Sequence, residues 1–145
     1  MTDPVYAWRG LRFVAPAGWR DDTLVTLTGP GATMNLTVSQ DTLSGPVDAY
    51  ARAQEAAVAA QRLAGYRAQA PQKVRVGTVD AVVCERELHD ARGQPLVQRQ
   101  AFVVVVAGTV VIVTATARAT DKAAASAALD GVVSSLGTSA AGAPR

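Results

Sequence analysis

The chain has 145 residues and a net charge of +2 at pH 7, with Lys and Arg scattered along it. This length is typical of one domain, and so mild a charge excludes a basic surface for a nucleic-acid partner. Hydrophobic residues make up 49% of the chain and aromatic residues only 5%, so we expect Val- and Ala-rich sheet surface to dominate the packing. The lone cysteine, Cys84, excludes an intrachain disulfide and fits a reducing compartment.

The start of the chain predicts a cytoplasmic protein that opens with a hairpin. Residues 1–4 have neither the basic nor the apolar region of a secretory signal. Two short apolar runs, residues 6–8 and 11–15, flank Arg9 and Gly10 and predict a hairpin with glycine at its tight turn. No cofactor is needed to hold together a domain of this size.

Two further strands are predicted at residues 23–28 and 34–40, around a turn at residues 29–31. The turn lacks the Lys and Ser or Thr of a phosphate-binding loop, so we interpret it as a plain turn. The second strand alternates between an apolar face that should meet the core and a polar face. The apolar face carries Met34, Leu36 and Val38, and the polar face carries Asn35, Thr37 and Ser39.

Two helices are predicted. The first begins near Pro46 and runs through an Ala-rich segment to Leu63, before Gly65 ends it. The second begins after residues 120–121, and its apolar residues recur at helical spacing, so we expect it to pack on the sheet. These residues are Ala125, Ala128, Leu129, Val132, Val133 and Leu136.

Between the helices, residues 74–76, 79–89, 96–106 and 110–117 predict four strands joined by short turns, which makes them an antiparallel meander. The uncharged stretch 101–117 could also be a short membrane helix. It is shorter than the roughly 20 residues that a bilayer requires and is rich in β-branched residues, so we favour a buried hairpin and no membrane insertion. The fold class is therefore α+β, with one domain over residues 1–137 and a flexible tail at 138–145.

The polar residues form no convincing catalytic or metal-binding set. Glu85, Glu87 and His89 share one strand face and could in principle bind a divalent metal. Because no second His or Cys lies nearby, a strand face with salt bridges to Arg86 or Arg99 is the better interpretation, and we predict neither a metal nor a catalytic residue.

Other chemistry is equally unsupported. His89 is the only histidine, and no Gly-x-Ser-x-Gly elbow exposes a serine nucleophile. Cys84 lies among apolar residues, where a thiol is usually inert packing. Asp21 and Asp22 are adjacent and point to opposite faces of an extended segment, so they make a poor acid/base pair. The sequence predicts a protein that is not an enzyme.

Amide side chains interrupt an apolar strand. Gln98, Gln100 and Phe102 alternate on one face of the strand that enters the Val-rich hairpin, and Thr114 and Thr116 suggest a similar mixed face on the next strand. A partly exposed strand end would explain this pattern. The alternative is a sheet face that offers hydrogen bonds to a partner that otherwise makes apolar contact.

Several motifs together resemble the DcrB-like family with the PsbP-like fold, over most of the chain up to about Leu136. These motifs are residues 13–19 (FVAPAGW) with Asp21 and Thr23, a helix ending near residues 65–66, residues 79–81 (VDA), residues 98–102 (QRQAF) and residues 113–116 (VTAT). Members often carry a glycine where this chain has Ala81. The resemblance implies an antiparallel sheet backed by helices.

Family members without an export signal include the effector-associated chaperones of type VI secretion systems. The resemblance implies a cytosolic, non-enzymatic chaperone, generally a homodimer, whose concave sheet face shields transmembrane segments of a secreted effector. Mapped onto this chain, the partner-binding residues are Leu24, Thr26, Gln98, Gln100, Phe102, Ile112 and Thr114.

Three alternatives stay open. The chain could be a general protein-interaction module of the same fold, or a carrier of a lipid or small molecule. It could also be an enzyme that uses the strand face of Glu85, Glu87 and His89.

Overall fold

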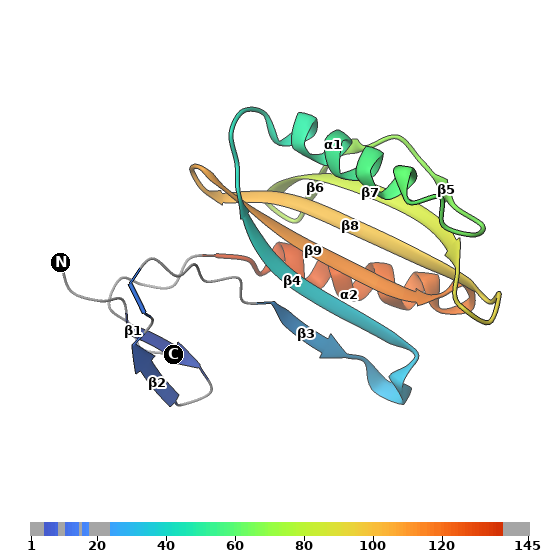
Figure 1. The fold of residues 1–145 in the computed structure, drawn as a ribbon, viewed down its shortest axis with the longest axis horizontal. Helices are drawn as coiled ribbons and strands as arrows, with labels where there is room; N and C mark the ends of the chain where they lie inside the picture. Colours follow the sequence, from blue (N-terminus) through green and yellow to red (C-terminus); the bar gives the residue numbers. More distant parts are fainter. Residues whose placement is uncertain (1–4, 9–10, 15, 18–23, 138–145) are drawn as a thin grey trace.

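The computed structural model describes residues 5–8, 11–14, 16–17 and 24–137, and its centre is a twisted antiparallel sheet (Figure 1). Seven strands form this sheet in the order β3-β4-β9-β8-β7-β5, with β6 paired to β7. The strands are β3 (Val25–Thr28), β4 (Met34–Thr42), β5 (Arg67–Ala68), β6 (Gln72–Val76), β7 (Val79–His89), β8 (Pro95–Val106) and β9 (Thr109–Arg118).

The three longest central strands follow one another in the chain. Antiparallel pairing joins β6 to β7, β7 to β8 and β8 to β9, which confirms the predicted meander. The Val-rich stretch forms the β8–β9 hairpin, with Gly108 at a positive φ of 81° in its turn. Strand β4 returns to pair with β9, and this places β3 at one edge of the sheet.

The first predicted hairpin also forms. Strands β1 (Val5–Trp8) and β2 (Leu11–Val14) pair antiparallel as a separate two-stranded sheet. The predicted tail at 138–145 and the pair Asp21 and Asp22 lie outside the described residues, as does Trp19 from the family motif.

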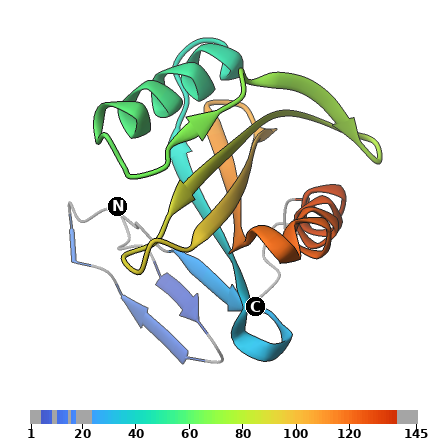
Figure 2. The ribbon, with the colours of Figure 1, turned by 90° about the vertical axis from the view of Figure 1, so that its right-hand side faces the viewer.

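One helix lies on each face of the sheet, as the end-on view shows (Figure 2). Helix α2 (Lys122–Ser134) packs on β8 and β9, and helix α1 (Val47–Ala60) packs on β7 and β8. The predicted helices are therefore confirmed, although α1 ends before Leu63. Arg62 has a positive φ of 52° and Gly65 one of 68°, so the backbone leaves the helical conformation here.

The larger apolar core lies between the sheet and α2. From the helix it receives Leu129 and Val133, both with 0% exposure, and from the sheet the Val and Ala side chains of β7, β8 and β9. Met34, Leu36 and Val38 pack against it, as their alternation predicts. Burial of these apolar side chains is the main hydrophobic contribution to folding.

A smaller apolar cluster lies under α1. Ala51 of the helix packs with Phe102 and Val82 of the sheet, and the Tyr50 ring meets the Phe102 ring edge-on at 5.9 Å between centroids. In the described part of the chain no helix is both long and apolar enough to span a bilayer.

Candidate partner-binding face

The strand register assigns each side chain of the sheet to the α1 side or the α2 side, because successive residues of a strand point to opposite faces. Gln100 of β8 lies opposite Cys84 of β7 and Thr114 of β9, and Thr114 lies opposite Thr37 of β4. Thr26 of β3 completes this row of side chains on the α1 side.

A second row runs beside the first. It contains Arg86, Gln98, Thr116, Asn35 and Thr28, taken from β7 to β3. On β3, β4, β8 and β9 all eight members of the two rows are Thr, Asn or Gln, which carry no formal charge. We call these eight residues the polar strip: Thr26, Thr28, Asn35, Thr37, Gln98, Gln100, Thr114 and Thr116.

The polar strip is open to a partner. Thr26, Thr28 and Asn35 are exposed, and the five other members are half-buried. The four strands that carry the strip lie about 4.8 Å apart, so the strip is about 14 Å wide. That width accommodates a single α-helix, whose diameter with side chains is about 10 to 12 Å.

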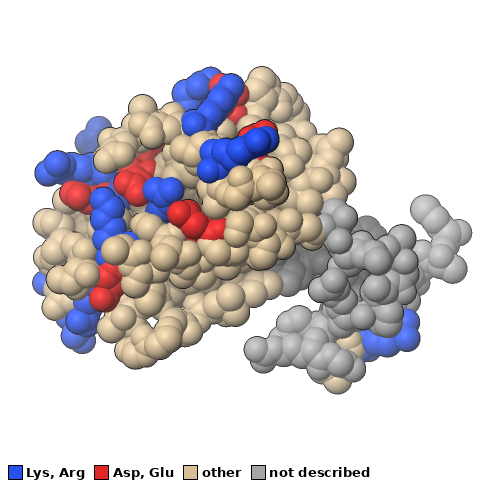
Figure 3. All heavy atoms as spheres, turned by 180° about the vertical axis from the view of Figure 1, so that it is seen from behind, with Lys and Arg blue, Asp and Glu red and all other residues tan. Residues whose placement is uncertain are grey.

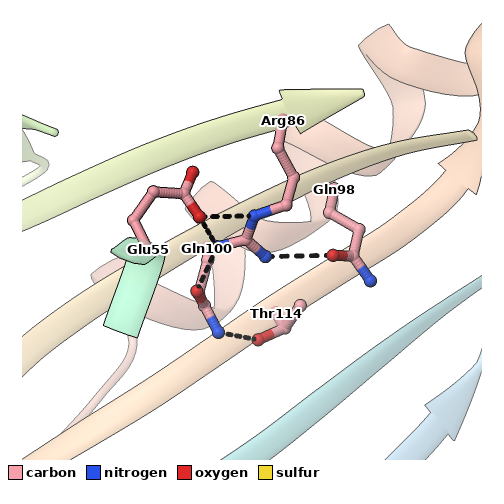
Figure 4. A network of polar contacts seen from close by, with 5 residues as sticks. All are labelled: Glu55, Arg86, Gln98, Gln100 and Thr114. Carbon is pink, nitrogen blue, oxygen red and sulfur yellow. Dashed lines mark hydrogen bonds and ion pairs between the residues drawn. The ribbon is translucent and has the colours of Figure 1, made fainter. Parts of the chain in front are cut away.

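A buried polar network adjoins the polar strip, where α1 meets the sheet (Figure 4). Arg86 Nε donates to Glu55 Oε2 at 2.9 Å, and Arg86 Nη2 lies 2.9 Å from the same oxygen. Arg86 Nη1 donates to Gln98 Oε1 at 3.0 Å, and Nη2 donates to Gln100 Oε1 at 2.8 Å. The guanidinium thus links α1 to both amides of the strip.

The two amides extend the hydrogen-bond network to β9. Gln98 Nε2 donates to Thr116 Oγ1 at 3.2 Å, and Gln100 Nε2 donates to Thr114 Oγ1 at 3.0 Å. The side chains of Arg86 and Glu55 retain only 3% and 11% of their exposure, so the carboxylate depends on the guanidinium for its charge partner. Burial, followed by the nearby Glu55 carboxylate, raises the pKa of Tyr66.

Most of the predicted binding residues share the α1 side. Thr26, Gln98, Gln100 and Thr114 belong to the polar strip. Ile112 lies on the same side, one row nearer α1, and is half-buried.

The two remaining predicted binding residues also do not belong to the polar strip. Phe102 is 1% exposed because Ala51 and Tyr50 of α1 cover it, so it packs beneath the helix and is not available to a partner in this structure. Leu24 directly precedes β3 and is 56% exposed.

Sequence reasoning missed the two charged members of the network. Arg86 was expected among the ion-pair partners of its own strand neighbours, but adjacent strand residues face opposite sides of the sheet. Its alternation with Val82 and Cys84 was the available signal, because it placed a cation on an otherwise apolar strand face. Nothing local identified Glu55 as its partner, since the two residues are 31 positions apart.

The face of Glu85, Glu87 and His89 lies on the α2 side and carries salt bridges, as predicted. Arg99 Nη1 lies 2.7 Å from Glu85 Oε1, and Lys122 Nζ lies 3.7 Å from Glu85 Oε2. Glu87 lies 3.9 Å from Arg67, both largely exposed. Within the residues that the structure describes, no cluster of His, Cys, Asp and Glu could hold a metal ion.

Cys84 lies on the α1 side and is 1% exposed, in the cluster under α1. Burial, followed by the negative charge of Glu55, raises the pKa of its thiol to about 11. A thiol that is protonated at neutral pH is a poor nucleophile, in agreement with the interpretation of Cys84 as inert packing.

A hollow of about 520 Å³ lies beyond the other end of α1. Val82, Phe102 and Val104 contribute apolar side chains to its lining, and Lys73 and Arg75 contribute cations. Seen from behind, the Lys and Arg side chains lie beside Asp and Glu and form no patch of one sign on that face (Figure 3).

The described fold and network can be set against known proteins. The family model for DcrB matches residues 11–135, so the chain belongs to the DcrB family. PA94 of Pseudomonas aeruginosa, a protein of unknown function described as a candidate regulator, has a similar crystal structure with a TM-score of 0.70. The two sequences are 20% identical, and the match covers 95% of this chain and 98% of PA94. No curated protein matches the sequence.

Proposed function

We propose that the chain is a non-enzymatic chaperone or adaptor that binds an apolar, helix-forming segment of another protein on the α1 side of its sheet. The observation that carries the proposal is the polar strip, which is uncharged, half-open and as wide as one helix. The resemblance to type VI secretion chaperones makes a transmembrane segment of a secreted effector the proposed client.

The residue types of the strip suit such a client. Interfaces between membrane helices are rich in Ser and Thr, because small hydroxyl side chains allow close approach and can hydrogen-bond across the interface. Six of the eight strip positions are Thr or Asn, and the two glutamines are held in place by Arg86. A bound helix would therefore exchange lipid contacts for contacts that resemble those of a neighbouring helix.

The test uses a fluorescent peptide of about 20 Ala and Leu residues with Lys at both ends as the probe. Thr114→Lys places a long charged side chain in the middle of the strip and should weaken binding by tenfold or more, a loss of about 1.4 kcal/mol. Thr78→Lys makes the same change in the exposed β6–β7 turn and should bind like the parent chain.

Fluorescence anisotropy measures binding, and thermal unfolding checks that both variants fold. Equal affinities for the Thr114→Lys and Thr78→Lys proteins would contradict the proposed face. An unmodified chain that leaves the peptide free at all concentrations would contradict the proposed function.

A second candidate function is the transport of a small apolar molecule. The hollow beside Val104 favours it, since about 520 Å³ falls within the range of known ligand sites. Native mass spectrometry of the purified chain tests this candidate, because a retained ligand would add its mass to the protein.

A further inference from the structure

The orientation of the two glutamine amides follows from the chemistry of Arg86. A guanidinium has five N–H donors and no acceptor, so only an amide oxygen can face it favourably. Both amides meet this requirement, with Gln98 Oε1 at 3.0 Å and Gln100 Oε1 at 2.8 Å from Arg86 nitrogens. A rotated amide would bring NH₂ against the cation and lose a charge-assisted hydrogen bond.

This orientation determines what the amides offer to their other neighbours. Each Nε2 carries two N–H groups, and one of them donates to a threonine hydroxyl oxygen, of Thr116 or Thr114. Within the described residues the second N–H of each amide has no further acceptor, and neither do the two hydroxyl hydrogens. The centre of the polar strip therefore presents hydrogen-bond donors.

The orientation of the network is fixed from helix α1. Glu55 holds Arg86 from the helix, and both side chains are almost completely buried, so the guanidinium has one orientation. Arg86 in turn orients the Gln98 amide toward β9, because Gln98 lies directly between Arg86 and Thr116 in its row. Arg86 and Glu55 are positioning residues in this scheme and need not contact a partner.

We infer that the Glu55–Arg86 pair sets the hydrogen-bonding polarity of the polar strip and selects client segments that bring acceptors. Suitable acceptors are side-chain oxygens or the carbonyl groups that small residues expose on an apolar helix. The inference rests on the proposed function, since it concerns which segments the same strip binds. A segment that offers only apolar groups would leave the donors of the strip without partners, at a cost in affinity.

The test compares two forms of one peptide. The probe is the Lys-flanked Ala and Leu helix with one central Met, either unmodified or as the sulfoxide. The sulfoxide adds one uncharged oxygen, which accepts hydrogen bonds and donates none. The measured quantity is the dissociation constant of the Met form divided by that of the sulfoxide form. We expect this ratio to be about fivefold higher for the unmodified chain than for the variant described next, a difference that corresponds to one hydrogen bond.

Gln100→Glu reverses the polarity while it preserves the contact with Arg86. One carboxylate oxygen accepts from the guanidinium as the amide oxygen did, and the other replaces the NH₂ group, so Thr114 becomes the donor. The preference for the sulfoxide should disappear. Gln94→Glu adds the same charge at an exposed turn position and should retain the preference.

Gln98→Glu provides a second variant with the same expected result, so a failure of Gln100→Glu to fold leaves the test intact. If the unmodified chain binds both peptides equally and Gln98→Glu and Gln100→Glu change nothing, the inference is wrong while the proposed function stands. If the unmodified chain binds neither peptide, the proposed function itself is wrong.

Discussion

Helix α2 covers its side of the sheet with a continuous apolar core, whereas α1 covers its side with a small cluster and a buried polar network. The two sides also place their arginines differently. Arg86 on the α1 side is 3% exposed, and Arg99 on the α2 side is 22% exposed, at the edge of the core. The apolar packing on the α2 side stabilises the fold, whereas the buried network on the α1 side holds polar groups in fixed positions.

This contrast explains why the open surface lies where it does. On the α2 side the sheet and helix meet through Val, Ala and Leu side chains, so the covered face has little to offer a polar partner. On the α1 side the helix packs on β7 and β8, and the polar strip continues beyond it to the edge strand β3. The comparison between the two sides can be tested by three measurements.

The largest expected effect comes from removing the buried cation. Arg86→Met leaves the Glu55 carboxylate buried without its charge partner, and we expect the free energy of unfolding to fall by about 4 kcal/mol. Arg99→Met is the matched control, because its ion pair with Glu85 is partly solvated and should cost about 1 kcal/mol. Urea denaturation measures both values, and equal losses would mean that the two arginines do not differ as described.

The apolar side can be tested at one leucine of α2. Leu129 is 0% exposed, so Leu129→Ala should create a cavity and reduce the free energy of unfolding by about 3 kcal/mol. Leu136 lies half-buried just beyond the helix, and Leu136→Ala should cost about 1 kcal/mol. Peptide binding by the folded Leu129→Ala protein should be unchanged. A loss of binding as large as that of Thr114→Lys would show that the two sides are not separate.

The smallest expected effect concerns the pH dependence on the α1 side. The pKa of the Cys84 thiol is raised from 9.0 to about 11, so the unfolded chain loses this proton at a lower pH than the folded chain. The contribution is complete below pH 9 and is lost as the pH rises from 9 through 11. Stability should therefore fall less steeply over this range in Cys84→Ala than in the parent chain, as measured by urea denaturation at several pH values. If the stability of both proteins changed with pH in the same way, the pKa of the Cys84 thiol would not be raised by folding.

Much of the fold could be predicted because its signals are local. The alternation of Met34, Leu36 and Val38 predicted which face of β4 meets the core, and the Val-rich stretch predicted the buried hairpin of β8 and β9. The short strand β5 was not predicted, because two exposed residues carry no periodic pattern. Likewise, alternation placed Gln98 and Gln100 on one face, but it could not show that Phe102 on the same face lies beneath α1.

The sequence by itself determined the α+β class, the antiparallel meander of residues 74–117 and the family, because periodicity, turn residues and motif spacing are properties of neighbouring positions. Only the tertiary structure decided that Glu55 of α1 meets Arg86 of β7, and that this pair orients two amides toward the open part of the sheet. That arrangement depends on which helix packs on which face and in which register, and contacts between distant positions leave no periodic trace in the chain.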